Sequence, residues 1–346
     1  MRWWSEPQTT TESARPRRTE AIRRVIKRPR PRPPPSPAIR SGKPLGLLEL
    51  DRFSNESLTR WKAFSKDLDE LQAALYFGVL PEQRRLREAL IATLHETKRS
   101  SLTLDHWVRI VTYQYSMEPL SAAGSLHAFG GRFNAGVDLD ASTLNPWPAL
   151  YVAEDYETAF RERHQMSPGD VVDGLTPHEL ALVRPSSHST VYLNGSLANV
   201  FDMTTPGSLA SVARILARIK LPARALTLKK SLRIPPQVLW MIATGQQLYD
   251  AVLTYNWRTL PVQFGLPASG HTLAELVRAA GFEAILYRST KGKGRCLAIF
   301  PDLLGSHSHV ELADVAPVGV TRLRLDASSG DDLAGWDTLP SQWRPR

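Results

Sequence analysis

The chain has 346 residues, of which 42% are hydrophobic and 22% are charged, an ordinary composition for one or two globular domains. Its single cysteine, Cys296, excludes an internal disulfide and a multi-thiolate metal site, and it favours a reducing, cytoplasmic compartment. No stretch approaches the roughly 18 apolar residues of a membrane helix, and the start lacks the apolar core of a secretory signal. We therefore expect no membrane insertion.

The excess positive charge lies in the N-terminal tail, residues 1–45. Its first 44 residues hold twelve Lys and Arg against three Glu, which accounts for the +9 net charge of the whole chain. Nine prolines and few apolar residues leave the tail unable to offset its ordering entropy, so we expect it to be disordered. Its arginines allow contact with nucleic acid, anionic lipid or a protein partner, but a solvated leader without a partner fits equally well.

Residues 46–100 carry two apolar stripes with helical spacing. The first runs from Asn55 to Phe77, where Gly78 would end the helix. The second runs from Pro81 to about His95. We expect a helical hairpin that docks on the larger domain, with a separate partner-recognition module as the alternative.

Short β-rich runs alternate with helical patterns across residues 101–305. These runs include 107–113, 149–153 and 284–287. The alternation predicts an α/β (α+β) domain built around a small sheet. Residues 306–346 return to Ser, Asp, Gly and Pro, and we expect them to form a surface appendage.

Local signals place several helix ends and turns. Asp155 is a candidate N-cap for a helix over 156–163. Thr272 and Glu275 have the spacing of a capping box at the start of a helix that Gly281 would end. The strands AILYRS and CLAIF follow, and we expect the intervening TKGKGR to form a hairpin turn.

Three segments combine polar residues with tight backbone signals: GGRFNAG at 130–136, LYVAEDYETAFRE at 150–162, and GFEAILYRSTKGKGRC at 281–296. Arg132 follows two glycines and could donate a forked pair of hydrogen bonds to phosphate. Glu162 lies two turns into a predicted helix, and Ser289 ends a predicted strand. Each also has an ordinary structural explanation, as a hairpin arginine, a solvated glutamate and a turn-capping serine. Residue patterns alone leave the function open.

Histidines and the cysteine offer no clear further site. The spacings of His106, His127 and His164 match no metal-ligand pattern, and we expect no metal. Cys296 lies in a predicted strand, where a buried small apolar residue is a better explanation than a nucleophile.

Taken together and in order, these segments resemble the RES domain, the toxin component of a family of bacterial toxin–antitoxin systems. The resemblance includes NVFDMT at 199–204 and covers about residues 105–304. It implies an ADP-ribosyltransferase-like split β-sheet core in a catalytic domain over 101–305. It also implies an NAD+-consuming toxin that breaks the nicotinamide–ribose bond by hydrolysis or phosphorolysis, and an antitoxin or immunity partner.

The same resemblance assigns roles to five residues. It implies that Glu162 and Ser289 are catalytic and that Arg109, Arg132 and Tyr151 hold NAD+. The two arginines would bind the pyrophosphate, Tyr151 would pack against the nicotinamide, and Ser289 would bond its carboxamide or the ribose. A carboxylate such as Glu162 suits this chemistry, because bond cleavage builds positive charge on the ribose.

Two other functions remain open. The protein could transfer ADP-ribose to one protein target, or it could be a catalytically silent scaffold whose basic tail binds nucleic acid or a partner. The long N-terminal extension could also serve delivery into another cell.

Overall fold

The computed structural model describes residues 55–166, 188–235, 241–254, 257, 262 and 265–335. The predicted tail, residues 1–45, lies outside this part of the chain. Contacts divide the chain into two compact units, one formed by residues 1–81 and 221–240 and the other by 82–220 and 241–346. No helix in the described part of the chain is long and apolar enough to cross a bilayer.

The helices are distributed between both units. The α-helices are α2 (Asn55–His95), α3 (Tyr156–His164), α5 (Ala210–Leu216), α6 (Ala223–Ser231), α7 (Gly245–Val252), α8 (Ser269–Ala279) and α9 (Gly330–Ala334). Short 3₁₀ helices are η2 (Tyr113–Tyr115), η3 (Ala123–Leu126), η4 (Pro206–Leu209) and η6 (Pro301–Leu303).

The first unit contains α6 and the N-terminal part of α2, packed through Leu71, Ala225, Leu228 and Leu232. Here the predicted helical hairpin is wrong, because α2 is a single helix of 41 residues that passes through both break signals. A Cβ on Gly78 would lie 2.4 Å from Cγ of Pro222, so this glycine permits close packing instead of ending the helix. Pro81 lacks one backbone donor, and the helix continues past it.

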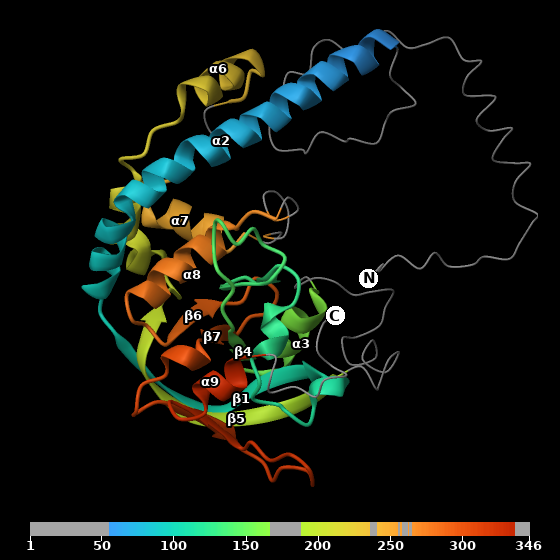
Figure 1. The fold of residues 1–346 in the computed structure, drawn as a ribbon, viewed down its shortest axis with the longest axis vertical. Helices are drawn as coiled ribbons and strands as arrows, with labels where there is room; N and C mark the ends of the chain where they lie inside the picture. Colours follow the sequence, from blue (N-terminus) through green and yellow to red (C-terminus); the bar gives the residue numbers. More distant parts are fainter. Residues whose placement is uncertain are drawn as a thin grey trace, which may run out of the picture. The chain divides into compact units, whose positions relative to one another are not determined.

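The second unit is built on a seven-stranded sheet in the order β1–β4–β7–β6–β5–β8–β9. Its strands are β1 (Ser100–Thr112), β4 (Leu150–Ala153), β5 (His188–Asp202), β6 (Ala284–Arg288), β7 (Arg295–Ile299), β8 (His309–Leu312) and β9 (Arg324–Asp326). The long strands β1 and β5 also pair, so β1, β5, β8 and β9 form one part of the sheet and β4, β7 and β6 the other (Figure 1). The prediction of a mixed α/β (α+β) core is confirmed.

A smaller ladder joins β2 (Gly130–Gly131) to β3 (Asn134–Ala135). In the main sheet, β5 and β6 run parallel, whereas the other pairs are antiparallel. Hairpin pairing of β6 with β7 ends at Arg288 opposite Arg295, which confirms the turn predicted for TKGKGR.

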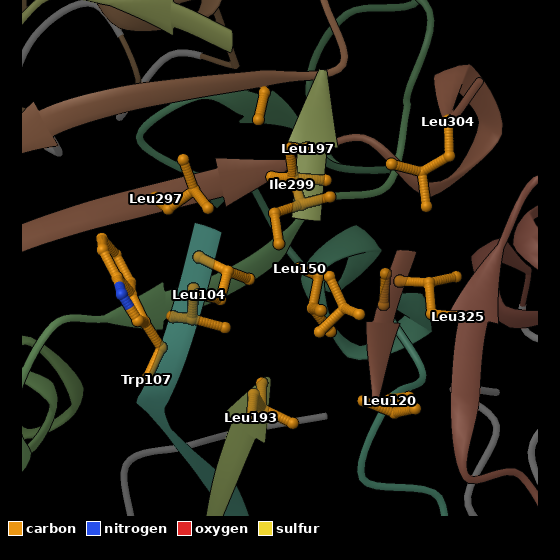
Figure 2. Close-up of a cluster of buried hydrophobic side chains, with 14 of the residues drawn as sticks. Leu104, Trp107, Leu120, Leu150, Leu193, Leu197, Leu297, Ile299, Leu304 and Leu325 are labelled. Carbon is orange, nitrogen blue, oxygen red and sulfur yellow. The ribbon is translucent and has the colours of Figure 1, made fainter. Parts of the chain in front are cut away.

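One face of the sheet carries the main hydrophobic core (Figure 2). Its members come from every large strand and include the fully buried Leu150, Leu193, Leu297 and Ile299. Burying a leucine or isoleucine side chain contributes about 1.5–3 kcal/mol, so this cluster is a principal source of stability.

The prediction of a surface appendage over 306–346 is wrong for residues 306–335, which the structure describes. Strand β8 pairs with β5 and β9 pairs with β8, so both extend the sheet. Val310, Leu325 and Leu333, from β8, β9 and α9, are fully buried in the main core. The segment is mostly polar in composition, but these three apolar residues are enough to anchor it in the core. Residues 336–346 lie outside the described residues.

Helix α3 begins as predicted, since Asp155 Oδ1 accepts the backbone N–H of Thr158 at 2.8 Å. Helix α8 begins earlier than predicted, at Ser269, and Thr272 is not its cap. Instead, the ring of His271 accepts the N–H of Ala268 at 3.1 Å. This histidine thus satisfies a backbone donor at the start of the helix, the role that the predicted capping box gives to the carboxylate of Glu275. The chain leaves α8 through Gly281, whose φ of +82° favours glycine, as predicted.

Candidate active site

A cavity of about 250 Å³ lies in the second unit, beside the strand ends of β1, β4, β6 and β7. Its lining includes Gly131, Arg132, Tyr151, Glu162, Arg163, Trp257, Tyr287 and Cys296. The structure therefore brings together Arg132, Tyr151 and Glu162 from two of the three segments singled out in the sequence. The third segment contributes Tyr287 and Cys296 to the wall.

Glu162 is positioned by α3 and held by the β6–β7 turn. Its Oε1 atom accepts the hydroxyl of Ser289 at 2.6 Å and the backbone N–H of Thr290 at 3.2 Å. Among the described residues, its Oε2 atom has no hydrogen-bond partner. One carboxylate oxygen is thus fixed by the protein, and the other is available to a ligand.

Ser289 uses its hydroxyl fully within the protein. Besides donating to Glu162, its Oγ atom accepts the backbone N–H groups of Lys291 at 3.0 Å and Gly292 at 2.8 Å. The sequence resemblance implied a direct contact with substrate for this serine. The structure instead gives it a contact with the proposed catalytic carboxylate.

Arg132 is buried in the wall, and only 5% of its surface is exposed. Its Nη1 atom donates to the carbonyl oxygens of Val252 at 3.0 Å and Thr254 at 2.8 Å, and Nη2 donates to Thr290 Oγ1 at 3.1 Å. These partners are neutral, so the positive charge is not cancelled by a direct ion pair. Burial lowers the pKa of Arg132, while the negative charge of Glu162 acts in the opposite direction.

Within the part of the chain that the structure describes, three of the five guanidinium N–H groups of Arg132 are occupied by these bonds. The Nε–H group and one Nη2 N–H group are the donors left for an anion. Its guanidinium carbon also lies 6.0 Å from the ring centroid of Trp257, another residue of the cavity wall.

Tyr151 holds the glycine-rich turn in place. Its hydroxyl accepts the N–H of Phe133 at 2.9 Å and donates to Asn134 Oδ1 at 2.9 Å. A Cβ on Gly131 would lie 2.4 Å from this hydroxyl, which explains why glycine is needed there. The side chain thus both lines the cavity and orders the turn that carries Arg132.

His271 fixes the same turn from the other side. It is fully buried, and since its Nδ1 accepts a backbone N–H, Nε2 carries the hydrogen that it donates to the carbonyl of Gly131 at 2.8 Å. The adjacent Gly270 allows this contact, because a Cβ there would lie 2.4 Å from the carbonyl oxygen of Arg132. Sequence reasoning missed both residues, since neither belongs to a recognisable motif.

Arg109 is not brought to the cavity. Its neighbours Val108 and Ile110 line the cavity, so the alternation of the strand sends Arg109 to the opposite face. A β-bulge causes this orientation: Leu104 is opposite Gly195, whereas Trp107 is already opposite Leu193, and His106 has a φ of +52°.

On that opposite face, Arg109 donates from Nη2 to the carbonyl of Ser121 at 2.7 Å. Its Nη1 atom is buried and lacks a hydrogen-bond partner among the described residues. Burial lowers the pKa of Arg109 to about 9. The implied role of Arg109 in binding pyrophosphate finds no support in this geometry.

Two further lining residues are aromatic. Trp257 is one of them. Tyr287 lies within a recognised segment, but only the strand register shows that it faces the cavity beside Cys296. Burial, followed by the charge of Glu162, raises the pKa of the Cys296 thiol well above its usual value, so this thiol stays neutral and does not serve as a nucleophile.

Comparisons with known proteins identify one family and one solved structure. A solved structure, the crystal structure of the M. tuberculosis MbcT–MbcA toxin–antitoxin complex, contains a chain that is 14% identical to this one. The match covers 71% of this chain and 97% of that chain, with a TM-score of 0.34. No curated protein matches significantly. The model of the RES domain matches residues 106–326, more than half of the chain, and the chain therefore belongs to the RES domain family.

Proposed function

We propose that this protein is an NAD+-consuming toxin that cleaves the nicotinamide–ribose bond. One observation carries the proposal: Glu162, held by Ser289 and Thr290, presents a carboxylate to a cavity that Arg132 also lines. Membership of the RES domain family supports the choice of NAD+ among possible dinucleotides.

Cleavage of the nicotinamide–ribose bond is favoured by negative charge near the ribose. When the bond between C1′ and the nicotinamide nitrogen breaks, its electron pair leaves with nicotinamide and positive charge builds on the ribose. The free Oε2 of Glu162 is suited to stabilise that charge directly or through a ribose hydroxyl. Water or phosphate then forms the new bond to C1′ through oxygen, and its proton passes to Glu162 or solvent.

The other lining residues bind and orient the substrate. Arg132 offers its remaining guanidinium edge and its uncompensated charge to the pyrophosphate. The rings of Tyr151, Trp257 and Tyr287 offer apolar walls to the nicotinamide or adenine. Because water is largely replaced by protein in such a cavity, these fixed charges act more strongly than they would in solution.

We propose that an antitoxin or immunity protein restrains this activity by covering the cavity. Uncontrolled loss of NAD+ would harm the producing cell in its cytoplasm, where the dinucleotide is abundant. A partner that blocks the cavity would prevent both substrate entry and product release. Nucleic-acid binding remains a proposal for the basic tail alone.

The test is to incubate the purified full chain with NAD+, with and without inorganic phosphate, and to identify both products by chromatography and mass. Release of nicotinamide together with ADP-ribose or its phosphorylated form would support the proposal and identify the acceptor. A stable ADP-ribosyl adduct on protein would indicate a transferase instead. Deletion of residues 1–44 should leave the turnover of NAD+ intact, whereas a silent nucleic-acid-binding scaffold would lose its only activity.

A further inference from the structure

A second arginine lines the cavity, and no motif singles it out. Arg163 follows Glu162 on α3, is exposed, and donates from Nη2 to Thr112 Oγ1 at 2.6 Å. The hydrogen bond to Thr112 ties the end of α3 to the end of β1 and restrains where this arginine can lie.

The charge of Arg163 is not matched by a carboxylate in the part of the chain that the structure describes. Two neighbouring arginines of this unit are paired: Arg161, two residues earlier on the same helix, bonds Glu157 at 2.8 Å, and Arg295 bonds Glu154 at 2.6 Å. An arginine that lines a cavity and donates, among the described residues, to a neutral hydroxyl is suited to a bound anion.

The surroundings of Arg163 also favour an anion. His164 and His188 lie with their ring centroids 5.4 Å apart. Burial lowers the pKa of both imidazoles, and the positive charge of Arg163 lowers the pKa of each further. A bound anion would offset this positive field, whereas a cationic ligand would add to it.

We infer that Arg163 binds a phosphate group of the ligand at this cavity, in the place that the resemblance would give to Arg109. This inference rests on the proposed function, which supplies the phosphate chemistry. Arg132 and Arg163 then both contact the ligand in the cavity that Glu162 also lines. The phosphate belongs either to the pyrophosphate of the dinucleotide or to inorganic phosphate acting as the acceptor.

Equilibrium binding to the full chain tests the inference without requiring turnover. The probes are ADP, adenosine and inorganic phosphate, and the variants are Arg163→Gln and Arg218→Gln. Arg218 is also an exposed arginine, it does not line the cavity, and it controls for the loss of one positive charge. Thermal unfolding of each variant confirms that it is folded.

We expect Arg163→Gln to weaken ADP binding about tenfold or more while adenosine binding stays unchanged, as expected for the loss of a charge-assisted hydrogen bond. A loss confined to inorganic phosphate would assign Arg163 to the acceptor instead. Unchanged affinity for both phosphate probes, an equal loss for Arg218→Gln, or no binding of either probe by the unmodified chain would overturn the inference. Arg163-dependent ADP binding without nicotinamide release from NAD+ would contradict the proposed function but not this inference.

Discussion

Ser289 and Glu162 are separated by 127 positions in the sequence, yet the serine hydroxyl donates to the glutamate Oε1 atom at 2.6 Å. Two backbone N–H groups of the β6–β7 turn donate to the same serine oxygen, so its hydrogen is directed at the carboxylate. The serine thereby couples the turn to helix α3 and fixes the direction in which the free Oε2 of Glu162 points.

This relationship predicts that Ser289→Ala lowers kcat more than it changes KM. Without the hydroxyl, the carboxylate loses its strongest restraint and samples other rotamers, while the groups that bind the substrate remain. We expect about a tenfold fall in kcat for nicotinamide release, the effect of one charge-assisted hydrogen bond. Ser208→Ala is the matched control, since its hydroxyl donates to the carbonyl of Thr205 at 2.9 Å and Ser208 does not line the cavity. A Ser289→Ala protein with wild-type kcat would show that the contact does not position Glu162 for catalysis.

The close approach of α8 to the glycine-rich turn predicts the effect of Gly270→Ala. The added methyl would lie 2.4 Å from the carbonyl oxygen of Arg132, a backbone atom that must then move. Because this shift displaces the arginine, we expect weaker ADP binding by roughly tenfold, measured by calorimetry. Gly207→Ala is the control, since the nearest atom to its new methyl would be 3.9 Å away. Equal affinities for the two variants would contradict the role of the turn.

Replacing Glu283 should lower the stability of the fold and leave the candidate active site unchanged. This buried carboxylate accepts the N–H groups of Asn199 at 3.0 Å and Gly305 at 2.9 Å, and the hydroxyl of Ser308 at 2.7 Å. Glu283→Ala leaves these donors unsatisfied, and we expect the free energy of unfolding to fall by about 2–4 kcal/mol in urea denaturation.

The control for Glu283 is Glu311→Ala, since Glu311 forms a solvent-exposed pair with Arg324 at 3.0 Å. Such pairs contribute about 0–1 kcal/mol. If both alanine variants lost the same stability, the buried network around Glu283 would not be a special source of it.

Residues next to one another in the sequence carried most of the successful predictions. The cap at Asp155, the break at Gly281 and the β6–β7 turn depend on local backbone geometry, which the residue types determine. The face of the sheet on which the side chain of Arg109 lies could not be predicted in this way. One extra residue in the β-bulge near His106 reverses which residues of the strand point to each face.

Contacts between distant segments were also hidden in the sequence. Glycine is a residue type that often ends helices, but Gly78 lies inside α2. There its missing side chain lets Pro222 pack closely against the helix. The roles of His271 and Arg163 depend on which segments meet at the cavity. The resemblance to the RES domain identified Glu162 and Ser289 as candidates, but only the structure shows that they are hydrogen-bonded to each other.

The paired histidines predict how stability depends on pH. Burial, then neighbouring positive charge, lowers the pKa of His164 and His188 below the usual 6.5, and the groups that face them include Arg163 and the ring of Phe160. The unfolded chain therefore binds more protons just below pH 6.5, and stability falls as the pH drops through that range. Replacing both histidines by asparagine should flatten this decline in thermal unfolding between about pH 7.5 and about pH 5.5, roughly one unit either side of the usual imidazole pKa.

Exposed His307 provides the control for the pH series. His307→Asn should keep the decline of the unmodified chain. A decline of the same steepness in the double variant would show that other groups cause the acid sensitivity.

The central claim is that Glu162 drives cleavage of NAD+, and the most direct measurement is the rate of nicotinamide release by the full chain and its Glu162→Gln variant. Glu157→Gln on the same helix is the matched control, because Glu157 pairs with Arg161 and does not line the cavity. We predict a fall of about 10²–10³ for Glu162→Gln, typical of removing one group that stabilises transition-state charge, and little change for Glu157→Gln. Equal rates for a folded Glu162→Gln protein and the unmodified chain would contradict the account.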